Sequence, residues 1–185
     1  MANEGLAHVN LLCLDPGFQN LGWSVIRVAR AGRWQVVAGG VFTTKKSTRK
    51  MNYLEASDDA RRVGELRDEL SAVVTMFDPL CICSEGVSYV RNAKVNFKVG
   101  MVWGLVHAFA IPVFTASPQE IKETCCRRKN ASKNDVQQAM IERKLIPPLP
   151  EKEKLHEHVW DSVAAGFTCA TSPTFRLMIR SAFKN

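Results

Sequence analysis

The stretch VNLLCLDPGFQNLGWSVI, residues 9–26, places one aspartate between two apolar runs. Its first run predicts a strand over residues 9–15, Pro16-Gly17 predicts a turn, and the second run predicts a strand over 21–30. A carboxylate at the end of a buried strand costs free energy unless something pairs with it. Asp15 is therefore the first candidate for a functional residue.

The composition restricts the class of protein. At 185 residues, the chain has the length of one domain with a substantial core. Its 25 basic and 18 acidic residues give a formal charge of +7, and this excess favours a polyanionic partner, with nucleic acid as the first candidate. No apolar run approaches the length of a membrane span, and residues 1–8 do not resemble a secretory signal. The six cysteines contain no C-x-x-C pair, which disfavours a zinc site and favours a reducing, cytoplasmic setting.

The order of apolar patterns along the chain predicts the fold class. Further strands are expected over 33–43, 80–85 and 111–116, and helices over 53–77, 92–110, 117–126, 133–144 and 155–170. The first three strands follow one another directly, so they predict a meander that is at least partly antiparallel. The whole order favours an α/β domain with a mixed sheet and helices on both faces. Residues 171–185 are expected to be a loosely ordered basic tail.

Two more acidic residues recur at element ends. Glu85 ends the strand predicted over 80–85, and Asp161 lies within an apolar stripe of the helix predicted over 155–170. Each of the three acids, taken singly, is also compatible with an ordinary turn, strand-end or surface position. Carboxylates that converge in the fold repel one another, and a divalent cation such as Mg²⁺ relieves this repulsion. Two such ions can clamp the attacking and leaving oxygens of a phosphodiester.

Four blocks of the sequence, in order, resemble one known family. LDPGFQNLGWSVI resembles the first strand and hairpin of RuvC-type Holliday junction resolvases, in the RNase H-like nuclease superfamily. SEGVSYVRNAKVNFKVGMVWG, TASPQEIKETCCRRKNASKNDVQQAM and HEHVWDSVAAGF resemble the blocks that follow. The D-P-G turn alone would be weak, because actin-like and sugar-kinase ATPases also begin with a D-x-G turn, although they need two such domains. The resemblance implies a single nuclease domain over 1–185, with its core at about 9–170 and an RNase H-like mixed five-stranded sheet flanked by helices on both faces.

The resemblance also implies a metal site. Asp15, Glu85 and Asp161 match three of the family's four acidic positions. The fourth position is His158, where the family usually has aspartate and some members have histidine. Imidazole suits Mn²⁺, so we expect Mg²⁺ with Mn²⁺ able to substitute, and two ions per site. His158 is also compatible with a surface position on its helix.

The resemblance assigns lysines and a set of DNA contacts. Lys133 and Lys122 match the family's two lysines near the scissile phosphate, so we expect Lys133 to stabilise the transition state and Lys122 to hold DNA. Ser88 stands where the family often has an aromatic residue that acts at the junction centre, and Tyr89 after it either stacks on a base or packs in the loop. The remaining candidates for DNA contact are basic: Arg91, Lys94 and then Lys98 at the start of helix 92–110, and Arg127, Arg128 and Lys129 in the RRK run.

The implied function is that of a homodimeric, metal-dependent endonuclease. The helix predicted over 92–110 resembles the family's dimer helix, and Gly100 and Gly104 would permit close approach, although core packing explains its apolar residues equally well. We expect paired symmetric nicks in four-way DNA junctions that leave 5′-phosphate and 3′-hydroxyl ends. Two alternatives stay open: a relaxed nuclease for flaps, forks and replication intermediates, and a protein with an inactive RuvC-like fold that only binds branched DNA. Divergence from familiar cellular members favours a phage or mobile-element origin, and hence action in a bacterial host's cytoplasm.

Overall fold

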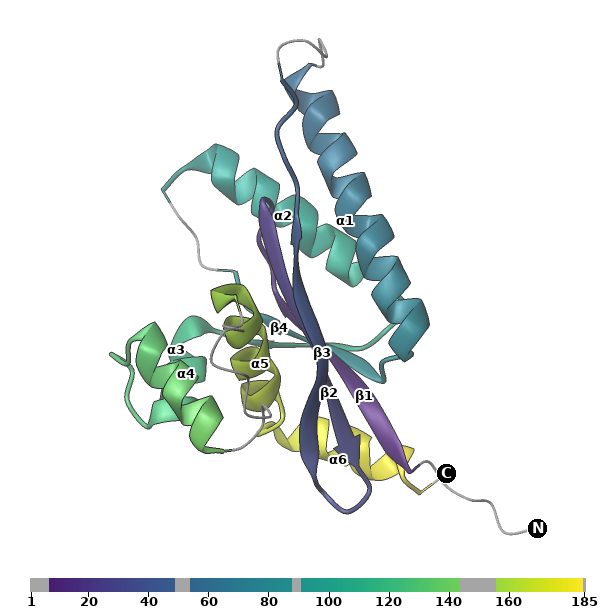
Figure 1. The fold of residues 1–185 in the computed structure, drawn as a ribbon, viewed down its shortest axis with the longest axis vertical. Helices are drawn as coiled ribbons and strands as arrows, with labels where there is room; N and C mark the ends of the chain where they lie inside the picture. Colours follow the sequence, from purple (N-terminus) through teal and green to yellow (C-terminus); the bar gives the residue numbers. More distant parts are fainter. Residues whose placement is uncertain (1–6, 49–53, 88–90, 144–155, 185) are drawn as a thin grey trace, which may run out of the picture.

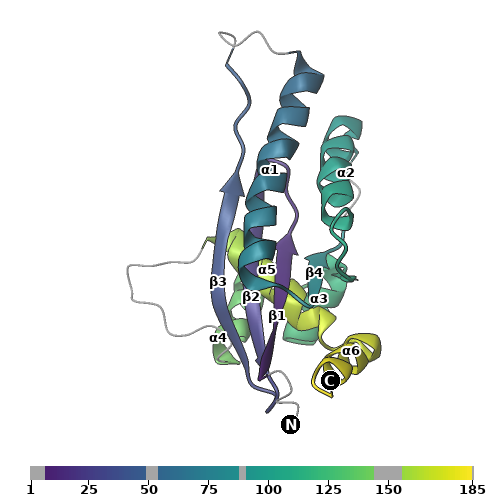
Figure 2. The same cartoon turned by 90° about the vertical axis from the view of Figure 1, so that its right-hand side faces the viewer.

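The fold is a five-stranded sheet with helices on both faces, seen in a computed structural model that describes residues 7–48, 54–87, 91–143 and 156–184 (Figures 1 and 2). The strands are β1 (His8–Asp15), β2 (Asn20–Ala29), β3 (Trp34–Thr43), β4 (Cys81–Glu85) and β5 (Val113–Ala116). The helices are α1 (Glu55–Phe77), α2 (Ala93–His107), α3 (Pro118–Cys126), α4 (Lys133–Glu142), α5 (Glu157–Cys169) and α6 (Pro173–Ala182). The mixed α/β architecture predicted from the sequence is confirmed.

The sheet order is β3-β2-β1-β4-β5. β1, β2 and β3 form the expected antiparallel meander, whereas β4 pairs in parallel with both β1 and β5. In the β1–β4 ladder Leu14 is level with Ser84. The next residue of each strand is acidic, so Asp15 and Glu85 emerge side by side at the same edge of the sheet.

Alternation along β1 divides the core into two layers. Leu12 and Leu14 pack with residues of α1 and α2 on one face, while Leu11 and Cys13 pack with α5 and its neighbouring helices on the other. α1 and α2 lie side by side on the first face, and α3, α4, α5 and α6 cover the second (Figures 1 and 2). Cys13, Cys81 and Cys83 are buried and free, as expected of small apolar residues.

Helices α3 and α4 begin with side-chain caps. Ser117 and Glu120 form a reciprocal capping box at the start of α3. Ser132 caps α4 in the same way with Asp135. These contacts fix where each helix begins, and the second of them places Lys133 at the first position of α4.

The expectation of a loosely ordered tail is wrong. Residues Pro173–Ala182 form α6, and Phe175 is only 1% exposed. The Phe175 ring packs edge-on against Phe114, with centroids 5.4 Å apart, and also contacts Trp34. Apolar residues recur at helical spacing at Phe175, Met178 and Ile179, and this periodicity outweighs the interspersed basic residues.

Within the described residues, no helix combines the length and the apolar character that a membrane crossing requires.

Candidate active site

Three elements bring acidic side chains to one edge of the sheet. Asp15 ends β1, Glu85 ends β4, and Asp161 lies near the start of α5, which packs across β1 and β2. The start of α5 approaches β2 closely. A Cβ added at Gly22 would lie only 2.3 Å from the carbonyl oxygen of His158. Glycine at this position therefore allows α5 to present its first turns beside Asp15.

Asp15, His158 and Asp161 form the tightest group. Each offers one ligand atom, and these atoms all lie within 4.8 Å of one another. His158 Nδ1 lies 2.6 Å from Asp15 Oδ2, with both side chains partly buried. The one-turn spacing of His158 and Asp161 along α5 places both on the face that meets β1. The sequence-based expectation that these side chains converge agrees with this geometry.

Glu85 stands beside that group and interacts with it through charge. Burial, followed by the charges of Asp15 and Asp161, raises the pKa of Glu85 to about 7. Burial likewise raises the pKa of Asp15, against the opposing effect of its hydrogen bond with His158. The pKa values of these two carboxyl groups stay raised, so the nearby cations do not fully offset burial and the repulsion between the acids.

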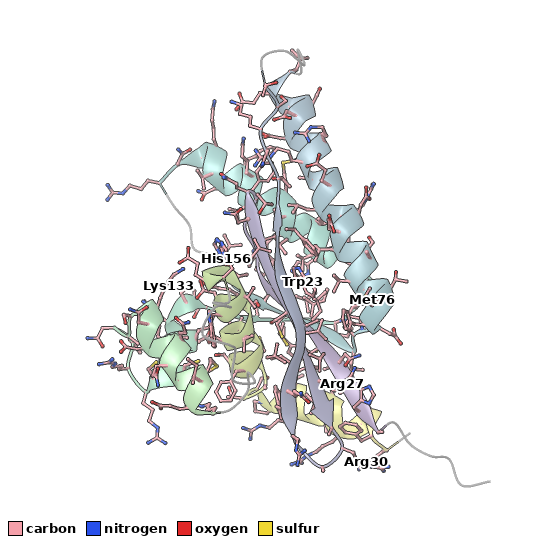
Figure 3. All side chains as sticks on the ribbon, viewed as in Figure 1. Trp23, Arg27, Arg30, Met76, Lys133 and His156 are labelled. Atoms are coloured by element: carbon pink, nitrogen blue, oxygen red, sulfur yellow. The ribbon has the colours of Figure 1, made fainter. Side chains whose placement is uncertain are left out.

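Lys133 supplies positive charge at the rim of the site. Its Nζ donates a hydrogen bond of 2.8 Å to Asp161 Oδ2 and lies 3.6 Å from Glu157 Oε2. The hydrogen bond to Asp161 raises the pKa of Lys133. Lys122, on α3, is close enough to lower the pKa of Glu85 through its charge. Figure 3 shows Lys133 and His156 close to each other.

The donor set fits a divalent cation. Three carboxylates and one imidazole offer the oxygen and nitrogen ligands that Mg²⁺ and Mn²⁺ accept. Burial is the main cause of the raised pKa of Glu85, and a 2+ ion here would offset the repulsion from Asp15 and Asp161 that adds to it. The ring nitrogen of His158 lies within 4.8 Å of a carboxylate oxygen of Asp15 and of Asp161, so one ion could contact all three side chains. The roles of these residues as ligands stay predictions.

The predicted DNA contacts have different surroundings in the structure. Arg91 and Lys94 are exposed at the start of α2, with Lys94 Nζ 3.8 Å from Glu55. In the α3–α4 loop, Arg128 pairs with Asp135 at 2.7 Å and Lys129 lies 3.9 Å from Glu123. Arg127 is exposed and adopts a left-handed backbone conformation after α3. Ser88 and Tyr89 lie outside the described residues.

Lys98, which was also expected to face DNA, has partners within the protein, and its contact with DNA stays a prediction. Its Nζ donates to Asp59 Oδ1 at 2.9 Å and lies 5.2 Å from the centre of the Phe18 ring. Arg62, from α1, lies over the same ring at 4.2 Å. Phe18 follows the Asp15 turn, so these two cations hold that turn against α1 and α2. The contact between Arg62 and Phe18 was not predicted, because the sequence of an amphipathic helix does not show which residue a charged side chain contacts.

One face of α2 is unpartnered within the described residues. A Cβ added at Gly100 or Gly104 would meet no atom within 4 Å. Phe97 is 67% exposed and Val95 is 43% exposed on the same helix. An apolar helix face of this kind is typical of a surface covered by another molecule.

Comparisons with known proteins agree on one family. The model of the family "Crossover junction endodeoxyribonuclease RuvC" matches residues 11–168. The enzyme of that name from Pseudothermotoga lettingae is 36% identical over 129 residues, which cover 68% of this chain and 74% of the relative. The one from Pelodictyon phaeoclathratiforme is 30% identical over 145 residues, covering 76% of this chain and 71% of the relative.

Solved structures share the fold. Thermus thermophilus RuvC superimposes with a TM-score of 0.70 at 22% identity, covering 92% of this chain and 98% of that one. The yeast mitochondrial Holliday junction resolvase gives a TM-score of 0.62 at 13% identity, covering 97% and 83% respectively.

Proposed function

This chain belongs to the RuvC family of crossover junction endodeoxyribonucleases, and we propose that it resolves four-way DNA junctions by paired symmetric nicks. The observation that carries the proposal is the convergence of Asp15, His158 and Asp161 within 4.8 Å, with Glu85 beside them. Each nick would hydrolyse one phosphodiester and leave a 5′-phosphate and a 3′-hydroxyl. The RuvC of Thermus thermophilus has been solved with a Holliday junction substrate, and its shared fold supports branched DNA as the partner here.

The ligands proposed for the metal are Asp15, Glu85, His158 and Asp161, with Mg²⁺ as the resident ion and Mn²⁺ able to replace it. We propose two ions per site, since three carboxylates supply enough oxygens for a pair. Bound divalent ions supply a lowered pKa for an attacking water and positive charge at the phosphate. Because His158 replaces one oxygen ligand by nitrogen, the site should tolerate Mn²⁺ better than a site built of carboxylates alone.

The two lysines would act on the phosphate. The Lys133 side chain is exposed at the rim of the site, and its Nζ lies 2.8 Å from Asp161 Oδ2. With Asp161 engaged as a metal ligand, the ammonium group of Lys133 would be free to pair with a phosphate oxygen and to stabilise the charge that develops there. Lys122, on the neighbouring helix, would hold the DNA backbone close to Glu85 without touching the reacting atoms.

DNA would be held mainly through its phosphates. The proposed contacts are Arg91 and Lys94 at the start of α2 and Arg127, Arg128 and Lys129 between α3 and α4, all of which are exposed. Contacts of this kind position the duplex without reading sequence, and they make binding strongly dependent on salt. Ser88 and Tyr89 are proposed, from the family resemblance, to act at the junction centre.

We further propose a homodimer built on α2. Its exposed Phe97 and the open surface at Gly100 and Gly104 offer an apolar face for a second copy. A two-fold dimer of single-domain chains would carry two active sites, one for each strand that must be cut. The proposed setting is the cytoplasm of a bacterial cell, whether the chain is encoded by the cell or by a phage.

Cleavage of matched substrates tests the proposal. Purified protein would be incubated with Mg²⁺ or Mn²⁺ and an end-labelled four-way junction, a flap, a fork and a linear duplex of the same sequence. A junction resolvase cuts the junction at two symmetric positions in opposing strands and leaves ends that ligase rejoins directly. Equal cutting of the flap and fork would contradict junction selectivity and favour a relaxed nuclease.

A further inference from the structure

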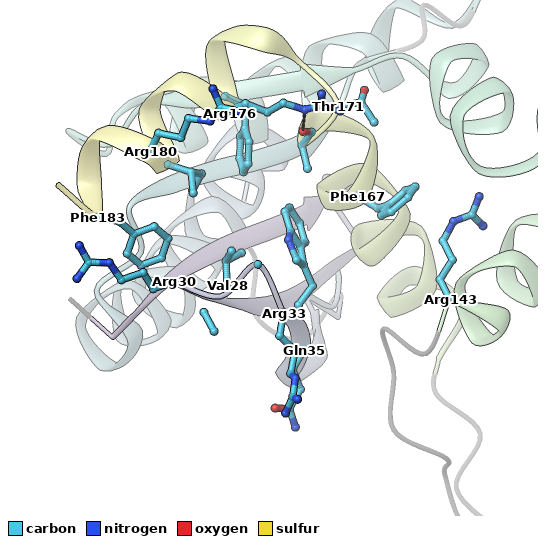
Figure 4. A pocket seen from close by; sticks show the side chains of 16 residues that line it. Val28, Arg30, Arg33, Gln35, Arg143, Phe167, Thr171, Arg176, Arg180 and Phe183 are labelled. Atoms are coloured by element: carbon cyan, nitrogen blue, oxygen red, sulfur yellow. Dashed lines mark hydrogen bonds between the residues drawn. The ribbon is translucent and has the colours of Figure 1, made fainter. Parts of the chain in front are cut away.

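A groove lies near the end of β1 that is farther from the active site. It has a volume of about 1050 Å³ and lies between the β2–β3 hairpin, the end of α5 and α6 (Figure 4). Ala29, in its lining, pairs with His8 at the start of β1, whereas Asp15 ends that strand. Seven residues of strand separate these two points, or about 23 Å. Figure 3 shows the separation as well, with Arg30 and Lys133 at distant positions.

The groove has an apolar floor and a cationic rim. Trp34, Phe167 and Phe175 contribute aromatic rings to the lining. Five arginines also line it: Arg30, Arg33, Arg143, Arg176 and Arg180. Arg30 and Arg33 come from the hairpin and Arg176 and Arg180 from α6, so both walls of the groove contribute arginines (Figure 4). The lining contains no aspartate or glutamate.

These arginines lack carboxylate partners among the described residues. Arg143 donates to the carbonyl oxygens of Ala139 and Cys125, and Arg176 donates to that of Ala170. No ion pair joins any of the five to an acidic side chain in the described part of the chain, whereas Arg61, Arg62, Arg67 and Arg128 each have one. Five guanidinium groups around one hollow repel one another, and an anionic ligand would relieve this repulsion.

The shape of the groove favours a peptide over nucleic acid. Duplex DNA presents its phosphates on a convex surface, which protruding cations contact without any need for a concave apolar floor. Single strands need free aromatic faces for base stacking. Here Phe175 is 1% exposed, Phe183 is 9% exposed, and Trp34 packs against Phe175. Arg143 lies over the Phe167 ring, 5.0 Å from its centre.

We propose that the groove binds an acidic segment of a partner protein in which carboxylates alternate with large apolar side chains. The apolar side chains would enter between Trp34 and Phe167, and the carboxylates would pair with Arg33 and Arg180 at the rim. Because the groove lies at the other end of β1 from Asp15, the partner can stay bound while the enzyme engages a junction. The groove would then tether the nuclease to another protein without changing its chemistry.

Binding of a model peptide tests the proposal. The probe is a fluorescein-labelled decapeptide in which aspartates alternate with leucine and phenylalanine, and its binding to the intact protein is followed by fluorescence anisotropy. Two matched variants, Arg180→Glu in the groove and Arg67→Glu on α1, change the total charge by the same amount. Both side chains are exposed, so both variants should fold. We expect Arg180→Glu to weaken binding at least tenfold and Arg67→Glu to change it less than twofold.

Two further arms make the outcomes decisive. A peptide with serine in place of leucine and phenylalanine should bind at least tenfold more weakly, and junction cleavage should be the same in wild type and Arg180→Glu. Equal loss in both variants would show only a general charge effect and would overturn the proposal. Displacement of the probe by a single-stranded oligonucleotide, or impaired junction cleavage by Arg180→Glu, would assign the groove to nucleic acid instead. Failure of the proposed nuclease function would leave the peptide result unaffected.

Discussion

Replacing Glu85 by glutamine should stabilise the metal-free protein while it removes activity. Burial and the neighbouring acids raise the pKa of Glu85 from 4.5 to about 7. The folded state therefore holds this proton more firmly than the unfolded state does. The resulting contribution to stability is present below about pH 4.5 and is lost as the pH rises through 7.

The size of the effect follows from the two pKa values. Each pKa unit corresponds to about 1.36 kcal/mol. Linkage between pKa values of 4.5 and about 7 gives a loss of about 2.5 kcal/mol in unfolding free energy between pH 5 and pH 8. Glutamine carries no charge, so the unfolding free energy of Glu85→Gln should fall less between pH 5 and pH 8. At pH 8 the variant should be roughly 2 kcal/mol more stable than wild type.

Urea denaturation in EDTA at pH 5 and pH 8 measures this difference. At pH 8, added Mg²⁺ should stabilise wild type more than Glu85→Gln, since the variant lacks one of the proposed ligands. Junction cleavage by the variant should be lost. If wild type and variant show the same pH dependence without metal, burial and the acidic neighbours do not destabilise the charged form of Glu85, and the reasoning fails.

Three other substitutions test separate parts of the account. Lys133→Ala should lower the single-turnover cleavage rate roughly 10²- to 10³-fold and change junction affinity less than threefold, because it removes charge stabilisation of the transition state; an equal loss of affinity and rate would show a DNA-holding role instead. His158→Asp should raise the ratio of the cleavage rate with Mg²⁺ to the rate with Mn²⁺, since it restores an all-carboxylate ligand set; an unchanged ratio would contradict ligation by His158. Phe175→Ala should reduce the unfolding free energy by about 3–5 kcal/mol, because this ring is buried between the sheet and α6; a loss under about 1 kcal/mol, by urea denaturation, would show that α6 does not depend on it.

Sequence patterns predicted the strands and the helix that carry the candidate site because those signals are local, whereas the roles of the site residues came from the family resemblance. Alternation along residues 9–15 placed Asp15 at a strand end, and the parallel pairing of β1 with β4 then brought Glu85 to the same edge. The one-turn spacing of His158 and Asp161 on α5 completed the group. Each of these signals lies within one element or at its end.

Features that depend on contacts between elements were not predicted. The ion pair between Lys98 on α2 and Asp59 on α1 joins residues that lie far apart in the sequence. The helix α6 was not predicted because its basic residues made this stretch look like a loose tail. In the structure, Phe175 packs α6 against Phe114 of the sheet. The cationic groove unites the β2–β3 hairpin, α5 and α6, and no single stretch of sequence contains it.

The most direct test of the central claim is cleavage of a labelled four-way junction by wild type and Asp15→Asn under Mg²⁺ and under Mn²⁺. Asparagine keeps the shape of the side chain at the end of β1 and removes its charge. The account predicts that the variant binds the junction as tightly as wild type and cuts it at least about a thousandfold more slowly with either ion. Cleavage by Asp15→Asn at the wild-type rate would show that this cluster of acids is not the catalytic site.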